Sequence, residues 1–194
     1  MNLQDYHPDL EPYFKLYCIE SVANIEHHSH SKVWQFLEKL ALDYNIHNIY
    51  KACDDMESLE SSLGQLIYED IDTSDFRILY FVLEGENNEI ILNDTVYQLE
   101  ELAEMFEGKL NDKIIHFANT KSLNLEEETF QYFLDVTGAK AISGYAHQAP
   151  IFSAALDLHY FSLYREIDDV VELVHKLYET HDKLYHAMGF RLYY

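Results

Sequence analysis

The stretch "RILYFVLEGENNEIIL" (residues 77–92) decides the fold of this chain. An apolar run from Ile78 to Leu83 stops abruptly at Glu84 and Gly85, and a polar bend then leads into a second apolar run at 90–92. A short apolar run that ends in turn-forming residues is typical of a buried strand. We therefore interpret the stretch as a strand whose end lies at the edge of an α/β sheet. The strand places Glu84 at that edge, and the role of a glutamate there is the question that the sequence raises.

Strand-like and helix-like segments alternate along most of the 194-residue chain. The patterns predict strands at 14–22, 46–53, 77–92, 113–119 and 139–146, and helices at 30–45, 55–70, 95–110, 124–138 and 153–189. Strands joined by helical crossovers favour a mostly parallel sheet with helices on both faces. The predicted fold class is therefore α/β, as a single domain over residues 1–194 with a helical C-terminal region from about residue 150.

Composition excludes several classes of partner. Thirteen Lys and Arg against thirty-five Asp and Glu give a net charge of -22. Phosphate recognition needs clustered cations, so this charge disfavours nucleic acid and anionic membranes as partners. The start of the chain, "MNLQDYHPDL", has neither the basic nor the apolar part of a signal peptide. Together with two cysteines in no metal-ligand pattern, it indicates a cytoplasmic protein with reduced thiols.

The carboxyl ends of the predicted strands are the places to look for a ligand site, because open α/β sheets bind ligands there. Each strand gives way to polar or small residues at that point. The candidate residues at this edge of the sheet are Glu84, Gly85, Asn119, Thr120, Gly144 and Tyr145.

The order and spacing of these segments resemble the caspase-like fold shared by caspases, gingipains and bacterial CHAT peptidases. They resemble more closely an uncharacterised family of short bacterial caspase-like proteins. The segments that carry the resemblance best are "ILYFVLEGENNEIILND", "LEELAEMFEGKLNDKIIHFANTKSL" and "FLDVTGAKAISGYA". The resemblance implies a three-layer caspase-like sandwich and a bacterial source. It also implies that a His-Gly pair ends the third strand and that a cysteine nucleophile ends the fourth.

Both residues of that catalytic dyad are replaced in this chain. The position of the histidine falls on Glu84, its glycine is kept as Gly85, and the cysteine falls on Thr120, with Asn119 as the alternative position. A threonine hydroxyl needs a strong base before it can attack a carbonyl, and a carboxylate with a pKa near 4.3 is a poor one. The sequence thus predicts a pseudopeptidase with a binding or regulatory role, no cofactor, and a polar or acidic edge suited to a basic peptide.

Two other interpretations stay open. The first is a hydrolase that uses Cys53, which ends the second strand, or a metal held by His27, His28 and His30 in "EHHSHSK". The motif lacks an evident fourth ligand. The second is a structural subunit that forms a homodimer through its tyrosine-rich C-terminal region. The last residues, "FRLYY", are then either a contact of the dimer or a strand added at the edge of the sheet.

Overall fold

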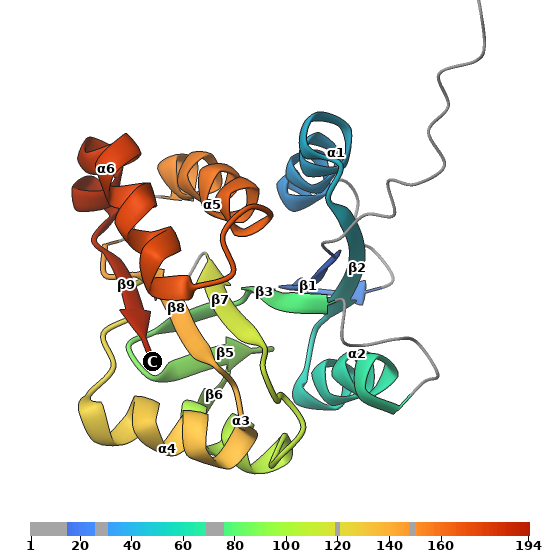
Figure 1. Cartoon of the computed structure of the whole chain (residues 1–194). Coiled ribbons are helices and arrows are strands. Elements are labelled where there is room, and N and C mark those ends of the chain that lie inside the picture. Colours follow the sequence, from blue (N-terminus) through green and yellow to red (C-terminus); the bar gives the residue numbers. More distant parts are fainter. Residues whose placement is uncertain (1–14, 26–30, 69–75, 119–120, 148–149) are drawn as a thin grey trace, which may run out of the picture.

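The computed structural model describes residues 15–25, 31–68, 76–118, 121–147 and 150–194. Within these residues the centre of the molecule is a six-stranded sheet with the strand order β2-β1-β3-β7-β8-β9 (Figure 1). Its strands are β1 (Lys15–Ser21), β2 (His47–Cys53), β3 (Phe76–Val82), β7 (Ile114–Ala118), β8 (Ala141–Tyr145) and β9 (Phe190–Tyr193). The first five are parallel, and β9 runs antiparallel to β8 at one edge.

Helices cover both faces of this sheet, as Figure 1 shows. One face is covered by α2 (Met56–Tyr68), α3 (Leu99–Met105) and α4 (Glu127–Thr137), and the other by α1 (Lys32–Tyr44), α5 (Pro150–Tyr164) and α6 (Val170–Met188). Along β3, Leu79 and Phe81 belong to the first core, whereas Ile78 and Tyr80 belong to the second. Burial of both faces explains why the central strands β3 and β7 are nearly continuous apolar runs. The predicted three-layer α/β sandwich is confirmed.

Polar residues and glycines fix the ends of several helices. The Ser31 hydroxyl accepts a hydrogen bond from the Val33 amide at 2.9 Å and begins α1. Asp169 caps α6 by accepting from two amides of its first turn. Gly138 takes the left-handed conformation (φ 78°) that ends α4.

The stretch at 77–92 is not one strand. After β3 ends at Val82, β4 (Glu84–Glu86), β5 (Glu89–Leu92) and β6 (Thr95–Gln98) form a separate antiparallel sheet of three strands. Asn93 and Asp94 both have positive φ, as a two-residue hairpin turn of type I′ requires. The predicted helix over 95–110 was therefore wrong at its start, because Thr95–Gln98 pairs with β5 and the helix begins at Leu99.

The C-terminal region is helical from Pro150, as predicted, but it does not end as a helix. The left-handed Gly189 (φ 60°) ends α6, and β9 then returns to pair with β8. The residues "FRLY" thus add a strand to the chain's own sheet. Among the helices in the described ranges, none is both long enough and apolar enough to span a membrane.

Candidate functional site

The three-stranded sheet of β4, β5 and β6, called the hairpin below, begins at the carboxyl edge of the central sheet. Glu84 is the first residue of β4, and its side chain is exposed, whereas Gly85 is buried. The amide of Lys121 donates to the carbonyl oxygen of Gly85 at 2.6 Å, and the amide of Leu123 donates to that of Tyr145 at 2.6 Å. The segment that follows β7 therefore lies between the hairpin and the end of β8.

Close packing requires the two glycines at this edge. A Cβ atom on Gly85 would lie 2.0 Å from the carbonyl oxygen of Glu89 on the neighbouring strand. One on Gly144 would lie 2.6 Å from the Leu123 side chain and 3.0 Å from the carbonyl oxygen of Phe117. Neither distance can be accommodated without movement, so glycine at both positions permits the close approach of neighbouring chain segments.

Tyr145 does not present its side chain at this edge. The residue is 2% exposed, and its hydroxyl donates a short hydrogen bond to Asp157 of α5. Side chains alternate along a strand, which places Tyr145 on the face that α5 covers. Of the other predicted residues, Asn119, Thr120, His27, His28 and His30 lie outside the described part of the chain.

A buried polar network under α5 was missed by sequence reasoning. Nε2 of His116 lies 2.8 Å from one carboxylate oxygen of Asp157, and Nδ1 lies 2.8 Å from Oγ of Ser143. The hydroxyls of Tyr80 and Tyr145 also donate to Asp157. Burial and the nearby Asp157 raise the pKa of both tyrosines well above the usual value, so that both stay protonated donors.

The Ser143–His116–Asp157 chain has the composition of a serine-hydrolase triad, but its location argues against that chemistry. All three side chains are 0% exposed. His116 is also surrounded by aromatic rings, including those of Tyr160 and Phe161 at 5.2 and 5.5 Å between ring centres. A substrate carbonyl cannot reach Oγ of Ser143 unless the core opens. The network therefore has a structural role, because its hydrogen bonds join α5 to β3, β7 and β8.

The two cysteines are poor nucleophiles in the folded protein. Both are 0% exposed. Burial is the main reason that the pKa of Cys53 is raised to about 12, and the charges of Asp54 and Asp55 add to the effect. Burial also raises the pKa of Cys18 well above its usual value. Because the thiolate is the reactive form, neither side chain is activated at neutral pH.

No group of three or more His, Cys, Asp and Glu side chains that could hold a metal ion occurs among the described residues. The histidines of "EHHSHSK" are outside that set. A cavity of about 680 Å³ does lie at the opposite, amino edge of the sheet, lined by Arg77, Lys109, Asn111, Asp112, Lys113, Lys140 and Tyr164. Sequence reasoning examined only the carboxyl ends of the strands and missed it.

Comparison with solved structures relates this fold to the caspases. The chain is similar to the crystal structure of the Drosophila initiator caspase Dronc, with a TM-score of 0.51 and 10% sequence identity, over 86% of this chain and 71% of that one. At this identity the similarity shows the fold alone, and it agrees with the caspase-like sandwich that the sequence predicts. No curated protein matches the sequence. The family model that matches covers residues 13–194, and the chain therefore belongs to the family of unknown function DUF6642.

Proposed function

We propose that this protein is a caspase-like pseudopeptidase, a binding protein on a peptidase scaffold that lacks peptidase chemistry. The observation that carries the proposal is Glu84, an exposed carboxylate directly after β3, where the peptidases of this fold have a histidine. A carboxylate is a much weaker base than an imidazole, so it cannot activate a hydroxyl as the histidine of those peptidases activates its nucleophile.

The hydrogen bonding around Glu84 supports this assignment. Gly85 follows the histidine-equivalent position, and Lys121 follows the cysteine-equivalent position, Thr120. The backbone bond of 2.6 Å between Gly85 and Lys121 joins these two neighbours. This is the proximity expected if positions 84 and 120 are equivalent to the dyad. Cys53 offers no substitute, because it is buried and its pKa is about 12.

The hairpin favours a basic ligand. Glu84 and Glu86 are exposed on the same side of β4, since alternate residues of a strand share a face. Glu86 is directly opposite Glu89 on β5, and both are exposed. Like charges at opposed positions of an antiparallel pair are destabilising. A bound lysine or arginine side chain would remove this repulsion, so a basic peptide is the ligand that the hairpin suits best.

Fluorescence anisotropy can test this proposal. A labelled peptide rich in lysine and arginine should bind, and a neutral peptide of equal length should not. The double variant Glu84→Gln/Glu86→Gln should weaken binding by about tenfold, because two charge-assisted hydrogen bonds are lost. The matched control, Glu172→Gln/Asp182→Asn on α6, removes the same charge from an exposed surface elsewhere. Equal weakening by both double variants would show a net-charge effect only and would refute a site on the hairpin.

A further inference from the structure

The amino edge of the sheet collects cations in a chain that is otherwise strongly acidic. Ile78 pairs with Ile114, and Ile114 pairs with Ala141, so the residues just before them share one row across three adjacent strands. That row consists of Arg77, Lys113 and Lys140. Neighbouring strands are about 4.8 Å apart, which makes the row roughly 10 Å long.

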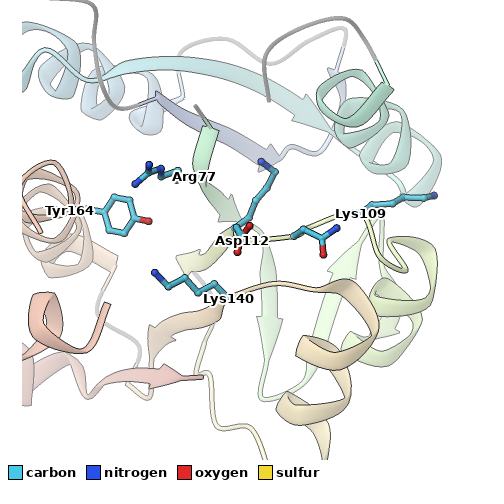
Figure 2. Close-up of a pocket in the computed structure, with 7 residues that line it drawn as sticks. Arg77, Lys109, Asp112, Lys140 and Tyr164 are labelled. Carbon is cyan, nitrogen blue, oxygen red and sulfur yellow. The ribbon is translucent and has the colours of Figure 1, made fainter. Parts of the chain in front are cut away.

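This row forms one wall of the cavity at the amino edge (Figure 2). Its volume of about 680 Å³ is within the range of sites for small ligands, roughly 300 to 1,000 Å³. Four cationic side chains line it, Lys109 being the fourth, against one acidic residue, Asp112. Local positive charge of this density, in a protein with a net charge of -22, indicates a site for an anion rather than a general surface property.

Three side chains of the cavity extend toward a common region. Figure 2 shows Arg77, Lys140 and the hydroxyl of Tyr164 directed toward one another, whereas Lys109 points away from them. Arg77 binds the carboxylate of Asp168 at 2.8 Å, and Nζ of Lys140 lies 3.3 Å from the carbonyl oxygen of the same residue. Burial raises the pKa of Tyr164, which keeps its hydroxyl protonated and able to donate.

In the folded chain, the anion that Arg77 binds is the carboxylate of Asp168. It comes from the residue before the N-cap of α6, and its side chain is 88% exposed. An exposed ion pair of this kind is weak. A ligand with more negative charge can therefore displace Asp168 from the guanidinium of Arg77 without opening the core.

We propose that this cavity binds a small molecule that carries two or more phosphate groups, held by Arg77, Lys140 and the Tyr164 hydroxyl in place of the Asp168 carboxylate. Arginine matches the geometry of phosphate oxygens through paired N–H groups, and lysine adds a point charge. Two cationic head groups and a hydroxyl that converge on one region can bind several oxygens of a phosphate chain at once, which a single carboxylate does not offer. The site is at the opposite edge of the sheet from Glu84 and is independent of the proposed peptide site.

Titration calorimetry of the full chain in metal-free buffer tests the proposal with pyrophosphate, inorganic triphosphate, inorganic phosphate, ATP and citrate as probes. Pyrophosphate and ATP should bind more tightly than phosphate and citrate. Tighter binding of ATP than of triphosphate would identify a nucleotide as the source of the phosphates, and equal binding would identify the phosphate chain itself. Citrate binding as tight as pyrophosphate binding would overturn the assignment to phosphate.

Variants that are expected to change the affinity in opposite directions make the test specific to this cavity. Lys140→Glu should weaken pyrophosphate binding by about tenfold or more, and Lys140→Arg should preserve it. Asp168→Asn should tighten binding by up to about fivefold, because the competing carboxylate is removed. Lys121→Glu is the matched control, since this exposed lysine lies at the carboxyl edge. No binding of any phosphate probe, or equal weakening by Lys140→Glu and Lys121→Glu, would overturn the proposal.

Discussion

Nε2 of His116, on the central strand β7, lies 2.8 Å from the carboxylate of Asp157, which is 41 residues further along the chain on α5. A carboxylate oxygen only accepts, so the imidazole donates this hydrogen bond through Nε2. Together with the hydroxyls of Tyr80 and Tyr145, this bond gives the fully buried Asp157 carboxylate three hydrogen-bond donors. The pair is the polar link between the helical layer of α5 and the sheet that carries the candidate site.

Removal of the carboxylate should destabilise the fold. Asp157→Ala leaves three buried donors without their acceptor, which costs about 3 kcal/mol in the free energy of unfolding. Urea-induced unfolding followed by circular dichroism measures the difference. Asp43→Ala, which breaks the exposed ion pair with Lys39, is the control and should have a much smaller effect. Equal effects of the two variants would contradict the role assigned to the network.

The glycine that follows Glu84 should be required by packing and not by chemistry. Gly85→Ala places a Cβ atom against the carbonyl oxygen of Glu89 and should lower the free energy of unfolding by about 1 to 3 kcal/mol. Glu84→Ala, at the exposed neighbouring position, should change it by no more than about 0.5 kcal/mol. Thermal or urea unfolding of both variants checks this. A Gly85→Ala protein as stable as Glu84→Ala would show that the hairpin accommodates a side chain there.

Both thiols should be inert in the folded protein. With its pKa at about 12, Cys53 has a thiolate fraction at about pH 8 that is roughly a thousandfold below that of a free cysteine. Titration with a chromogenic disulfide should therefore detect almost no rapid reaction in native buffer and both thiols in denaturant. One fast-reacting thiol in the native protein, lost in Cys53→Ser, would reopen the case for Cys53 as a nucleophile.

Acidification should destabilise the contact between α5 and α6 at His159. Its ring stacks on that of His181, with 3.7 Å between ring centres. Burial, and then the charge of His181, lowers the pKa of His159 below its ordinary 6.5. The unfolded chain therefore binds more protons as the pH falls below about 6.5, and the free energy of unfolding falls in that window.

The variant His159→Gln should show a shallower dependence of the unfolding free energy on pH between about pH 7.5 and about pH 5.5 than the wild-type protein. Val171→Ala, which changes an exposed side chain of α6 that does not titrate, is the control and should leave the slope unchanged. Parallel curves for wild type and His159→Gln would exclude the stacked pair as a source of the pH dependence.

Much of the fold could be predicted because the strands are buried on both faces. Unbroken apolar runs such as Ile78–Leu83 mark such strands in sequence, and caps such as Ser31 and Gly138 mark the helices between them. The hairpin at 84–98 was harder to predict. Its strands are only three or four residues long, and Thr95–Gln98 leads directly into a helix.

Side-chain partners distant in sequence could not be predicted. A lone histidine in "KIIHFAN" gives no indication of Asp157, because the pairing depends on how α5 packs on the sheet. The cationic row did leave a pattern in the sequence. Arg77, Lys113 and Lys140 each stand at the start of a predicted strand, and parallel strands bring such starts together. This pattern was missed because a site was expected only at the carboxyl ends of the strands.

A cleavage assay tests the central claim, that this scaffold lacks peptidase chemistry, most directly. The purified protein is incubated with a diverse peptide library, and the products are compared by mass spectrometry with those from Thr120→Ala. We expect no sequence-specific cleavage by either protein. Cleavage at defined sites by the wild-type protein that is abolished in Thr120→Ala would contradict it.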